Sequence, residues 1–507
     1  MKAAAGSPSP IEPSSSPGEW VRKNLFNSPL NAAITVVLTP IALYAAYRFF
    51  RFVFVTGRWD AVDTNLELFM IGQYPREERW RIVAQLLLLA PAIGLAVGLV
   101  RATANATAEE TGEPRPTTPW TAYVGSYWTV VLFVVTLLVA FVDTTGPWLL
   151  AIGCLAGGVV GWLLGGRVPP SLIPVGWSVA ALFVAASFQV LSGTGGWAWF
   201  YLAAALVPAL GVTVRFLPAQ ALPAVAGLGA LVGAGTLVWR PGVVGLIAAT
   251  VAVVILVNVK RGDRIDGARL GLYVLGGLAA YVVSRAIGHG GIDWKEWGGL
   301  QLNLVATVGA IVLAFPLGVL LAVGRRSDLP AIRVLCVAYI EFFRGAPLIT
   351  FLLSAQFFLG FFLDSDTPLS LVTRGIAAVT LFSAAYIAEI IRGGLQAVPK
   401  GQVEAGQALG LAPLKITRLI VLPQALRAVI PAMVGQFISL WKDTTLFTII
   451  SLPEFLDIRN LVHAQADFRG FGIAETLTFV AFGFWAVAYT MSKESQRLER
   501  RLGVGHR

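Results

Sequence analysis

The chain of 507 residues is 56% hydrophobic and only 13% charged, about half the charged fraction of a typical soluble globular protein. Its apolar residues form long uncharged runs, such as 122–142 and 242–259, close to the ~20 residues that a helix needs to cross a bilayer. The net charge of +10 raises the question of nucleic acid, but the basic residues lie mostly in short loops between apolar runs, as membrane topology requires. The chain is therefore predicted to be an all-α polytopic membrane protein that binds no nucleic acid.

About 14 transmembrane helices can be drawn, each with uncertain ends. They are 30–50, 81–100, 122–142, 147–165, 171–191, 197–214, 217–239, 242–259, 269–287, 300–323, 331–362, 370–391, 426–450 and 471–491. The spans before about residue 290 are rich in Gly, Ala and Val, whereas the later ones carry charged groups in or beside them. We therefore predict a disordered cytoplasmic tail over 1–27, an N-terminal transmembrane extension over 28–290 and a separate domain over 291–500.

The stretch 59–80, after the first span, is too polar to cross a bilayer. Its apolar part, Leu66, Leu68, Phe69 and Met70, favours an amphipathic element at the membrane interface. Both termini are predicted to be cytoplasmic, because most basic loops then lie inside. These loops hold Arg101, Arg167, Arg215, Lys260, Arg325, Arg326 and Lys400. The basic segment 58–81 is the main exception.

Neither a metal site nor a nucleotide site is predicted. The two cysteines, Cys154 and Cys336, lie in apolar runs, and the three histidines are scattered, so no set of metal ligands has a suitable spacing. No Gly-rich phosphate loop of the form G-x-x-x-x-G-K-[ST] occurs, and no Ser–His pairing indicates acyl transfer. The chain is expected to bind no cofactor and not to be an enzyme.

The longest polar insertion of the second half is 398–423, VPKGQVEAGQALGLAPLKITRLIVLP. A helix is predicted from Gln402 to Leu409, ended by Gly410. A second short helix is predicted from Pro413 to Val421, before Pro423 begins the next span. Two such helices across a membrane surface can form a rigid knob for the groove of a soluble partner.

This loop resembles the EAA loop of bacterial ATP-binding-cassette (ABC) import permeases. The resemblance rests on Glu404 and Ala405, then Gly410, then Ile420, Leu422 and Pro423, with Gly406 where that loop usually has Ala. It implies that the loop couples the chain to an ATPase through Glu404, Ala405, Gly406, Gly410, Leu411 and Pro423.

Neighbouring segments resemble the polar amino-acid permease domain over about 298–491. They are Gly298–Thr307, Tyr339–Leu348, Ala385–Gln402 and Trp441–Leu446. Gly324–Ser327, Ile71–Pro75 and the long N-terminal half look most like the general L-amino-acid permeases, although the segment 143–260 is not explained by that likeness.

The resemblance implies a five-helix type I importer core in a bacterial inner membrane. It also implies partners: two ABC ATPase subunits that use ATP and Mg, a second permease subunit that is a paralogue or an identical copy, and an extracytoplasmic substrate-binding protein. The cargo would be L-amino acids. The absence of a phosphate loop in the sequence agrees with ATP hydrolysis by another subunit.

Charged groups at membrane depth are costly, and they are candidates for the substrate path. The candidates are Glu341, Arg344, Glu389, Arg392, Lys442, Asp443 and Thr444. A zwitterionic amino acid needs a cation for its carboxylate and an acceptor for its ammonium. The pairs Glu341–Arg344 and Glu389–Arg392 are spaced i,i+3, so each can instead neutralise itself and hold helices together.

Two other classes of function remain open from the sequence. An ion-coupled secondary amino-acid transporter would need no ATPase and would usually show inverted repeats, which are not visible here. A non-transporting membrane scaffold or a membrane enzyme is suggested only by the unusual N-terminal half.

Overall fold

The computed structural model describes residues 16–112, 146–192, 292, 296–358 and 370–502. These residues are helical, with one isolated bridge between Gly299 and Glu454. They contain seven helices long and apolar enough to cross a membrane, or up to eight if one bent pair is counted as a span. The prediction of an all-α membrane protein is confirmed for this part of the chain. The count of 14 stays a prediction, since the predicted spans 122–142, 197–214, 217–239, 242–259 and 269–287 lie outside the described residues.

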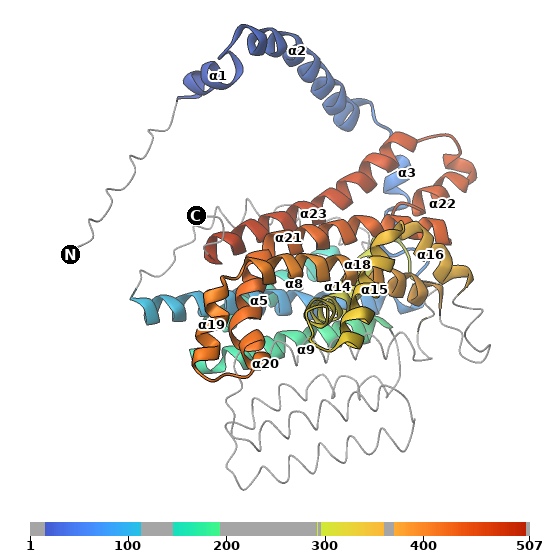
Figure 1. Cartoon of the computed structure of the whole chain (residues 1–507). Coiled ribbons are helices and arrows are strands. Elements are labelled where there is room, and N and C mark those ends of the chain that lie inside the picture. The colour runs from blue at the N-terminus through green and yellow to red at the C-terminus, as the bar shows by residue number, and fades with distance from the viewer. Residues whose placement is uncertain (1–15, 113–145, 193–291, 293–295, 359–369, 503–507) are drawn as a thin grey trace.

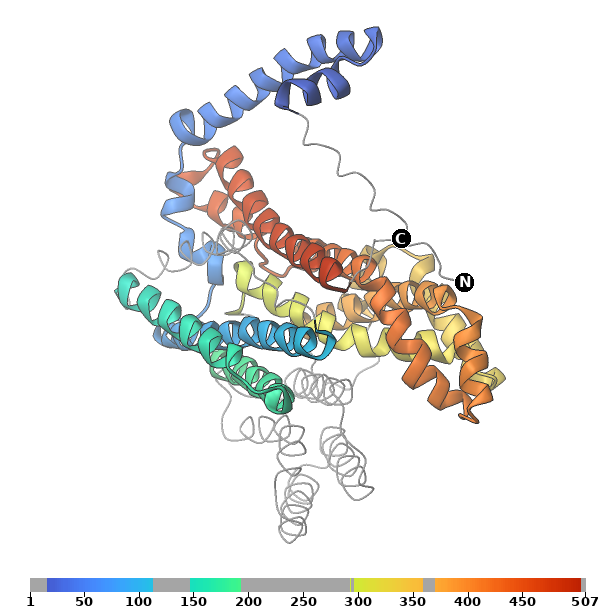
Figure 2. The same cartoon turned by 90° about the vertical axis from the view of Figure 1, so that its left-hand side faces the viewer.

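The N-terminal helices stand apart from the remaining helices (Figures 1 and 2). Within the tail expected to be disordered, α1 (Pro17–Leu25) is helical, because Ser16 and Glu19 form a capping box at its start. Helix α2 (Pro29–Arg51) is the first predicted span, and it has no buried residue. Its apolar surface is therefore not covered by the described part of the chain.

The segment after α2 returns to the protein core. It forms the short helices α3 (Asp60–Asp63) and α4 (Leu66–Ile71). The interfacial interpretation is wrong for α4: Phe69, Met70 and Ile71 are at most 1% exposed. The ring of Phe69 packs edge-on against Phe455 and Phe479, with centroid distances of 6.1 and 5.3 Å. The apolar side chains of α4 are therefore buried by other parts of the protein, whereas the sequence pattern had predicted that a membrane interface would surround them.

Glycines let the backbones of α4 and α14 (Gly299–Gly324) meet closely. A Cβ on Gly72 would lie 2.4 Å from the Gly298 Cα, and Gly72 also has a φ of +64°. Buried residues between Ala61 and Ile82 thus belong to one core cluster with Trp297, Leu300 and Phe455. The division of the chain near residue 290 remains a prediction about domains, but this N-terminal segment packs as part of the C-terminal core.

Helices α5 (Trp80–Thr111) and α8 (Pro147–Gly166) pack in parallel along a row of glycines. A Cβ on Gly153 would meet Leu87, one on Gly161 would lie 2.3 Å from the Pro91 oxygen, and one on Gly165 would lie 2.5 Å from the Leu95 oxygen. Small residues at four-residue spacing allow such close approach between membrane helices. Helix α9 (Ile173–Ser192), another predicted span, also packs on α5.

Helix α18 (Leu371–Ala397) is the centre of the C-terminal bundle. It packs against α14, α15 (Pro330–Gly345), α16 (Leu348–Phe357) and α21 (Leu422–Asp443), and α21 in turn packs against α23 (Ile473–Leu502). The short helices α19 (Lys400–Ala408) and α20 (Pro413–Ile416) lie at one end of the bundle, and α22 (Ile458–Ala464) lies at the opposite end (Figure 1).

The predicted span 331–362 is not one straight helix in the part that the structure describes, 331–358. The chain bends by 100° between α15 and α16. The bend lies at Gly345-Ala346-Pro347, where Ala346 is extended with φ −128° and ψ 154°. A residue before proline is pushed out of the helical region by the proline ring, and proline is well placed to precede a new helix. The two halves are therefore a broken span or a re-entrant element rather than one straight helix.

Candidate functional site

The loop 398–423 is folded at one end of the bundle as a hydrogen-bonded knob. Helix α19 ends in a Schellman motif: the Leu411 N–H donates to the Gly406 oxygen at 3.1 Å, and the Gly410 N–H donates to the Gln407 oxygen at 2.8 Å. Gly410 has a φ of +71°, the left-handed conformation that this motif requires. The predicted helix and its glycine end are confirmed, with the helix beginning at Lys400.

The second half of the knob differs from the prediction. Helix α20 continues through a π-helical turn, Thr417–Val421, directly into α21, so no break precedes Pro423. Pro423 lies in the first turn of α21, where its missing N–H needs no intrahelical partner. The loop is therefore joined rigidly to a long bundle helix, and a push on the knob acts along α21.

The predicted coupling residues divide into inner and outer positions. Glu404, Ala405, Gly410 and Pro423 are exposed, and Leu411 is half-buried. Gly406 is buried, and a Cβ there would lie 3.0 Å from Ile416 and 3.2 Å from Ile420. Leu409 is 77% exposed at the tip. A small residue at 406 thus holds the two halves together, while the outer surface offers one carboxylate and an apolar tip.

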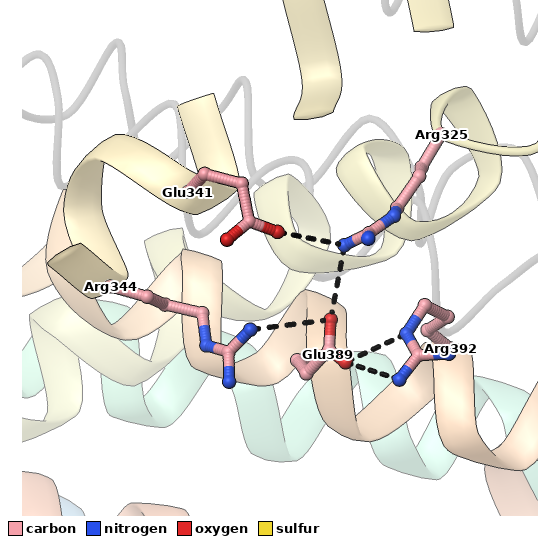
Figure 3. Close-up of polar contacts among 5 residues, drawn as sticks. All are labelled: Arg325, Glu341, Arg344, Glu389 and Arg392. Atoms are coloured by element: carbon pink, nitrogen blue, oxygen red, sulfur yellow. Dashed lines mark hydrogen bonds and ion pairs between the residues drawn. The ribbon is translucent and has the colours of Figure 1, made fainter. Parts of the chain in front are cut away.

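Four of the predicted path residues and Arg325 form an ion-pair network (Figure 3). It joins Arg325, just after α14, with Glu341 and Arg344 of α15 and Glu389 and Arg392 of α18. Arg325 contacts Glu389 at 3.2 Å and Glu341 at 3.6 Å, and Arg344 contacts Glu389 at 3.7 Å. Arg392 Nε donates to Glu389 Oε1 at 2.7 Å. Three guanidinium groups face two carboxylates, so the network carries an excess positive charge.

The pairing within this network was predicted only in part. Glu389–Arg392 forms as expected. In the part of the chain that the structure describes, Glu341 and Arg344 do not pair with each other. Glu341 contacts Arg325 instead, and Arg344 contacts Glu389. Arg325 was predicted as part of a basic loop and was not among the substrate-path candidates. Its role depends on the approach of the end of α14 to α18, which local spacing does not reveal.

The remaining path candidates lie at the other end of the bundle. Helix α21 starts at the knob and runs 22 residues to Asp443, about 33 Å at 1.5 Å per residue. Lys442 is exposed, Asp443 is half-buried and Thr444 is fully buried. The structure therefore separates the seven predicted path residues into one group beside the knob and one group a bundle length away.

Thr444 belongs to a buried polar cluster that the sequence reading missed. Asn303 Nδ2 donates to Thr444 Oγ1 and to Glu454 Oε2, both at 2.9 Å, while Asn303 Oδ1 accepts the Phe455 N–H. Glu454 Oε1 accepts from Thr448 and from the Asp457 N–H, both at 2.8 Å. Glu454 is 0% exposed, and burial raises the pKa of its carboxyl, against the lowering effect of these hydrogen bonds. Asn303 and Glu454 were visible as polar residues within apolar surroundings, and that was the available signal.

Comparison with known proteins adds a family match. Residues 314–484 match the family described as "Binding-protein-dependent transport system inner membrane component". The chain is 47% identical over 217 residues to the glutamate/glutamine/aspartate/asparagine transport system permease protein BztC of Rhodobacter capsulatus, covering 43% of this chain and 50% of that protein. It is 42% identical to the inner membrane amino-acid ABC transporter permease protein YhdY of Escherichia coli, covering 42% of this chain and 58% of that protein. The match thus spans only about half the length of these two relatives.

A shorter relative is covered almost completely. The probable glutamine ABC transporter permease protein GlnP of Bacillus subtilis is 35% identical over 205 residues, which cover 40% of this chain and 92% of that protein. Among solved structures, one titled as an amino acid ABC transporter with histidines is 30% identical, with a TM-score of 0.37 and coverage of 40% of this chain and 92% of that chain. The family match over 314–484 contains the knob, the ion-pair network, Thr444 and Glu454, whereas Asn303 lies before it.

Proposed function

This chain belongs to the family of binding-protein-dependent transport system inner membrane components, and from that premise we propose that it is the permease subunit of an ATP-driven importer of L-amino acids. The cargo class is supported by the relatives, whose names describe permeases for amino acids. The observation that carries the proposal is the knob, because it is a stiff, outward-facing element joined without a break to α21.

Coupling requires a partner subunit that hydrolyses ATP. The described residues carry no phosphate loop, so ATP and Mg would be bound by two separate ATPase subunits. The exposed Glu404 and the apolar tip at Leu409 suit a groove on such a subunit. Closure of the ATPases would move the knob and α21 together, and a second permease subunit, identical or paralogous, would move in the opposite sense.

Transport would then alternate between two states of the permease pair. Cargo would arrive from an extracytoplasmic binding protein at the end of the bundle that holds Lys442, Asp443 and Thr444. It would leave past the ion-pair network beside the knob. That network joins α14, α15 and α18 and has an excess cation, so it can meet a substrate carboxylate and can also hold the three helices in one state. In this proposal the N- and C-termini lie in the cytoplasm.

The test is a charge reversal on the knob. Glu404→Lys in the assembled transporter is expected to lower ATP-driven amino-acid uptake into vesicles at least tenfold while the chain still inserts, because an exposed side chain can be changed without disturbing the core. ATP hydrolysis by the complex is measured in parallel, so that lost docking is distinguished from lost coupling.

The matched control is Asp467→Lys, a charge reversal at an exposed position at the far end of the bundle. This control variant should leave ATP hydrolysis by the complex at the wild-type rate. Full ATP-driven uptake by Glu404→Lys would contradict the coupling role. Uptake by the purified chain alone, driven by an ion gradient, would favour the secondary-transporter alternative instead.

A further inference from the structure

A cavity lies away from the knob, between the ends of α5 and α8. Arg101 and Asn105 of α5 lie across a cavity of about 210 Å³ from Arg167, which directly follows α8, and from Trp162, Leu163 and Gly166 of α8. The guanidinium of Arg101 lies 5.6 Å from the centre of the Trp162 ring, a cation–π contact that holds its position. The parallel packing of α5 and α8 brings the two arginines to the same end of the helix pair.

The positive charge in this cavity has no ion-pair partner among the residues that the structure describes. Neither Arg101 nor Arg167 forms an ion pair with a carboxylate in the part of the chain that the structure describes. A Cβ on Gly166 would meet no atom within 4 Å, so the glycine leaves open space between them. Two guanidinium groups and the NH2 of one side-chain amide offer hydrogen-bond donors around an open space, and two of these groups are cations, which suits a phosphate group.

An apolar strip leads away from the cavity along α8. Leu155, Val159 and Leu163 are 68%, 52% and 41% exposed, and with Arg167 they recur every four residues. Residues four apart are neighbours on a helix surface, so the strip winds slowly around α8 and ends beside Arg167. A free phosphate ion would not need the strip. A phospholipid would, because its acyl chain extends from its phosphate into the hydrocarbon.

The side of the membrane follows from helix directions. The first turns of α5 and α14 line one cavity together, through Ile82 and Gln85 on α5 and Leu300 and Gln301 on α14. The end of α14 lies against the end of α18, where Arg326 donates to the Leu395 oxygen, and α18 leads into the knob. Arg101 and Arg167 therefore lie on the same side as the knob, which is the cytoplasmic side under the proposed function.

We propose that the cavity between Arg101 and Arg167 binds the phosphate headgroup of an anionic phospholipid, with an acyl chain along Leu155, Val159 and Leu163. Basic pockets between membrane helices at the cytoplasmic surface bind such headgroups, and the cytoplasmic leaflet is the anionic one. Only the choice of leaflet rests on the proposed function. The bound lipid would fasten α5 to α8 beside the bundle.

The test uses the full-length chain in detergent micelles, with native mass spectrometry during titration with phosphatidylglycerol. The double variant Arg101→Gln/Arg167→Gln is expected to bind phosphatidylglycerol at least tenfold more weakly. Gly166→Leu, which fills the cavity and leaves the charge unchanged, should weaken binding similarly. Arg76→Gln removes an exposed arginine at the opposite end and should bind as the wild type does.

Two comparisons decide the outcome. Equal phosphatidylglycerol binding by the wild type, the double variant and Gly166→Leu would overturn the site. Displacement of the lipid by an equal concentration of inorganic phosphate would overturn the lipid as its occupant and leave a phosphate site. Circular dichroism of each variant shows whether it is folded, and Gly166→Leu keeps the test valid if the double variant is not. No ATPase is present, so the result does not depend on the coupling proposal.

Discussion

Gly410 shows how one residue shapes the knob. Its φ of +71° allows the chain to turn back after α19 and to satisfy the last carbonyl groups of that helix. An added Cβ would meet nothing within 4 Å, so the cost of a side chain there is conformational and not steric.

We expect Gly410→Ala to destabilise the end of α19 by about 1–2 kcal/mol, the cost of a left-handed conformation for an L-residue with a Cβ. Hydrogen exchange should become faster across Lys400–Ala408. Gly401→Ala is the matched control in the same helix, because its Cβ also meets nothing within 4 Å and its φ is not positive. That control should exchange no faster than the wild type, and equal exchange in both variants would refute this explanation of Gly410.

Glu454 carries a buried carboxyl group at the end of the bundle opposite the knob. Burial raises its pKa above the ordinary value of 4.5, so the folded state favours the neutral form. The unfolded chain releases this proton at a lower pH. The contribution of Glu454 to stability is therefore fully present below about pH 4.5 and is lost as the pH rises through the raised pKa of the folded state.

Glu454→Gln should remove this pH dependence. We expect a lower Tm than the wild type at pH 4, because a glutamine amide cannot accept every hydrogen bond that the carboxyl receives. The difference should shrink as the pH rises from 4.5 to 8, since only the wild type loses stability through Glu454. Thermal unfolding of both proteins over this range measures it, with the exposed Asp467→Asn as control. A constant difference would contradict the raised pKa.

At the scale of elements, the α5–α8 pair depends on glycine more than on any apolar side chain. Without a hydrophobic driving force between helices in lipid, close backbone approach supplies the van der Waals contact that holds them together. The same contact sets the relative position of Arg101 and Arg167, so the geometry of the lipid site depends on it.

Gly161→Ala is expected to separate the two helices, because the new Cβ would lie 2.3 Å from the backbone oxygen of Pro91, which cannot rotate away. Overpacking of this kind costs about 1–3 kcal/mol. Gly166→Ala, five residues along the same helix, meets nothing and should have little effect. Unfolding in mixed micelles with increasing dodecyl sulfate compares the two variants. Equal midpoints would show that the glycine row does not hold the pair.

At the scale of the whole molecule, the ion-pair network and the buried polar cluster lie at opposite ends of the bundle. The ion-pair network lies beside the knob, and the cluster of Asn303, Thr444 and Glu454 lies beyond the far end of α21. An importer needs different events at its two ends, since cargo is received at one and ATP is used at the other. The arrangement predicts that, in a membrane, the end with the knob is accessible from the cytoplasm and the other end is accessible from outside the cell.

Cysteine labelling tests that arrangement. In a background of Cys154→Ala and Cys336→Ala, Gln407→Cys places a thiol on the exposed surface of α19 and Asp467→Cys places one at the other end. In intact cells, a membrane-impermeant maleimide should label Asp467→Cys and should label Gln407→Cys only after permeabilisation. Labelling of both from outside would contradict the orientation.

The sequence by itself determined the membrane class, the limits of α2, α8 and α14 within a few residues, the helix of the knob with its end at Gly410, and the pair Glu389–Arg392. Each of these depends on a run of apolar residues, a backbone conformation or a spacing of three residues, and all are local. The bend at Ala346 was also local, but the many apolar residues on both sides of Pro347 led to the prediction of one span.

Only the tertiary structure decided which charges meet and which apolar residues are buried. Arg325 reaches Glu389, 64 residues away, and Asn303 reaches Glu454, 151 residues away, because α14, α18 and the segment after α21 converge. The apolar side of α4 looked the same for a membrane surface and for a protein core. Hydropathy measures the preference of a side chain for apolar surroundings, and it does not say whether lipid or protein supplies them.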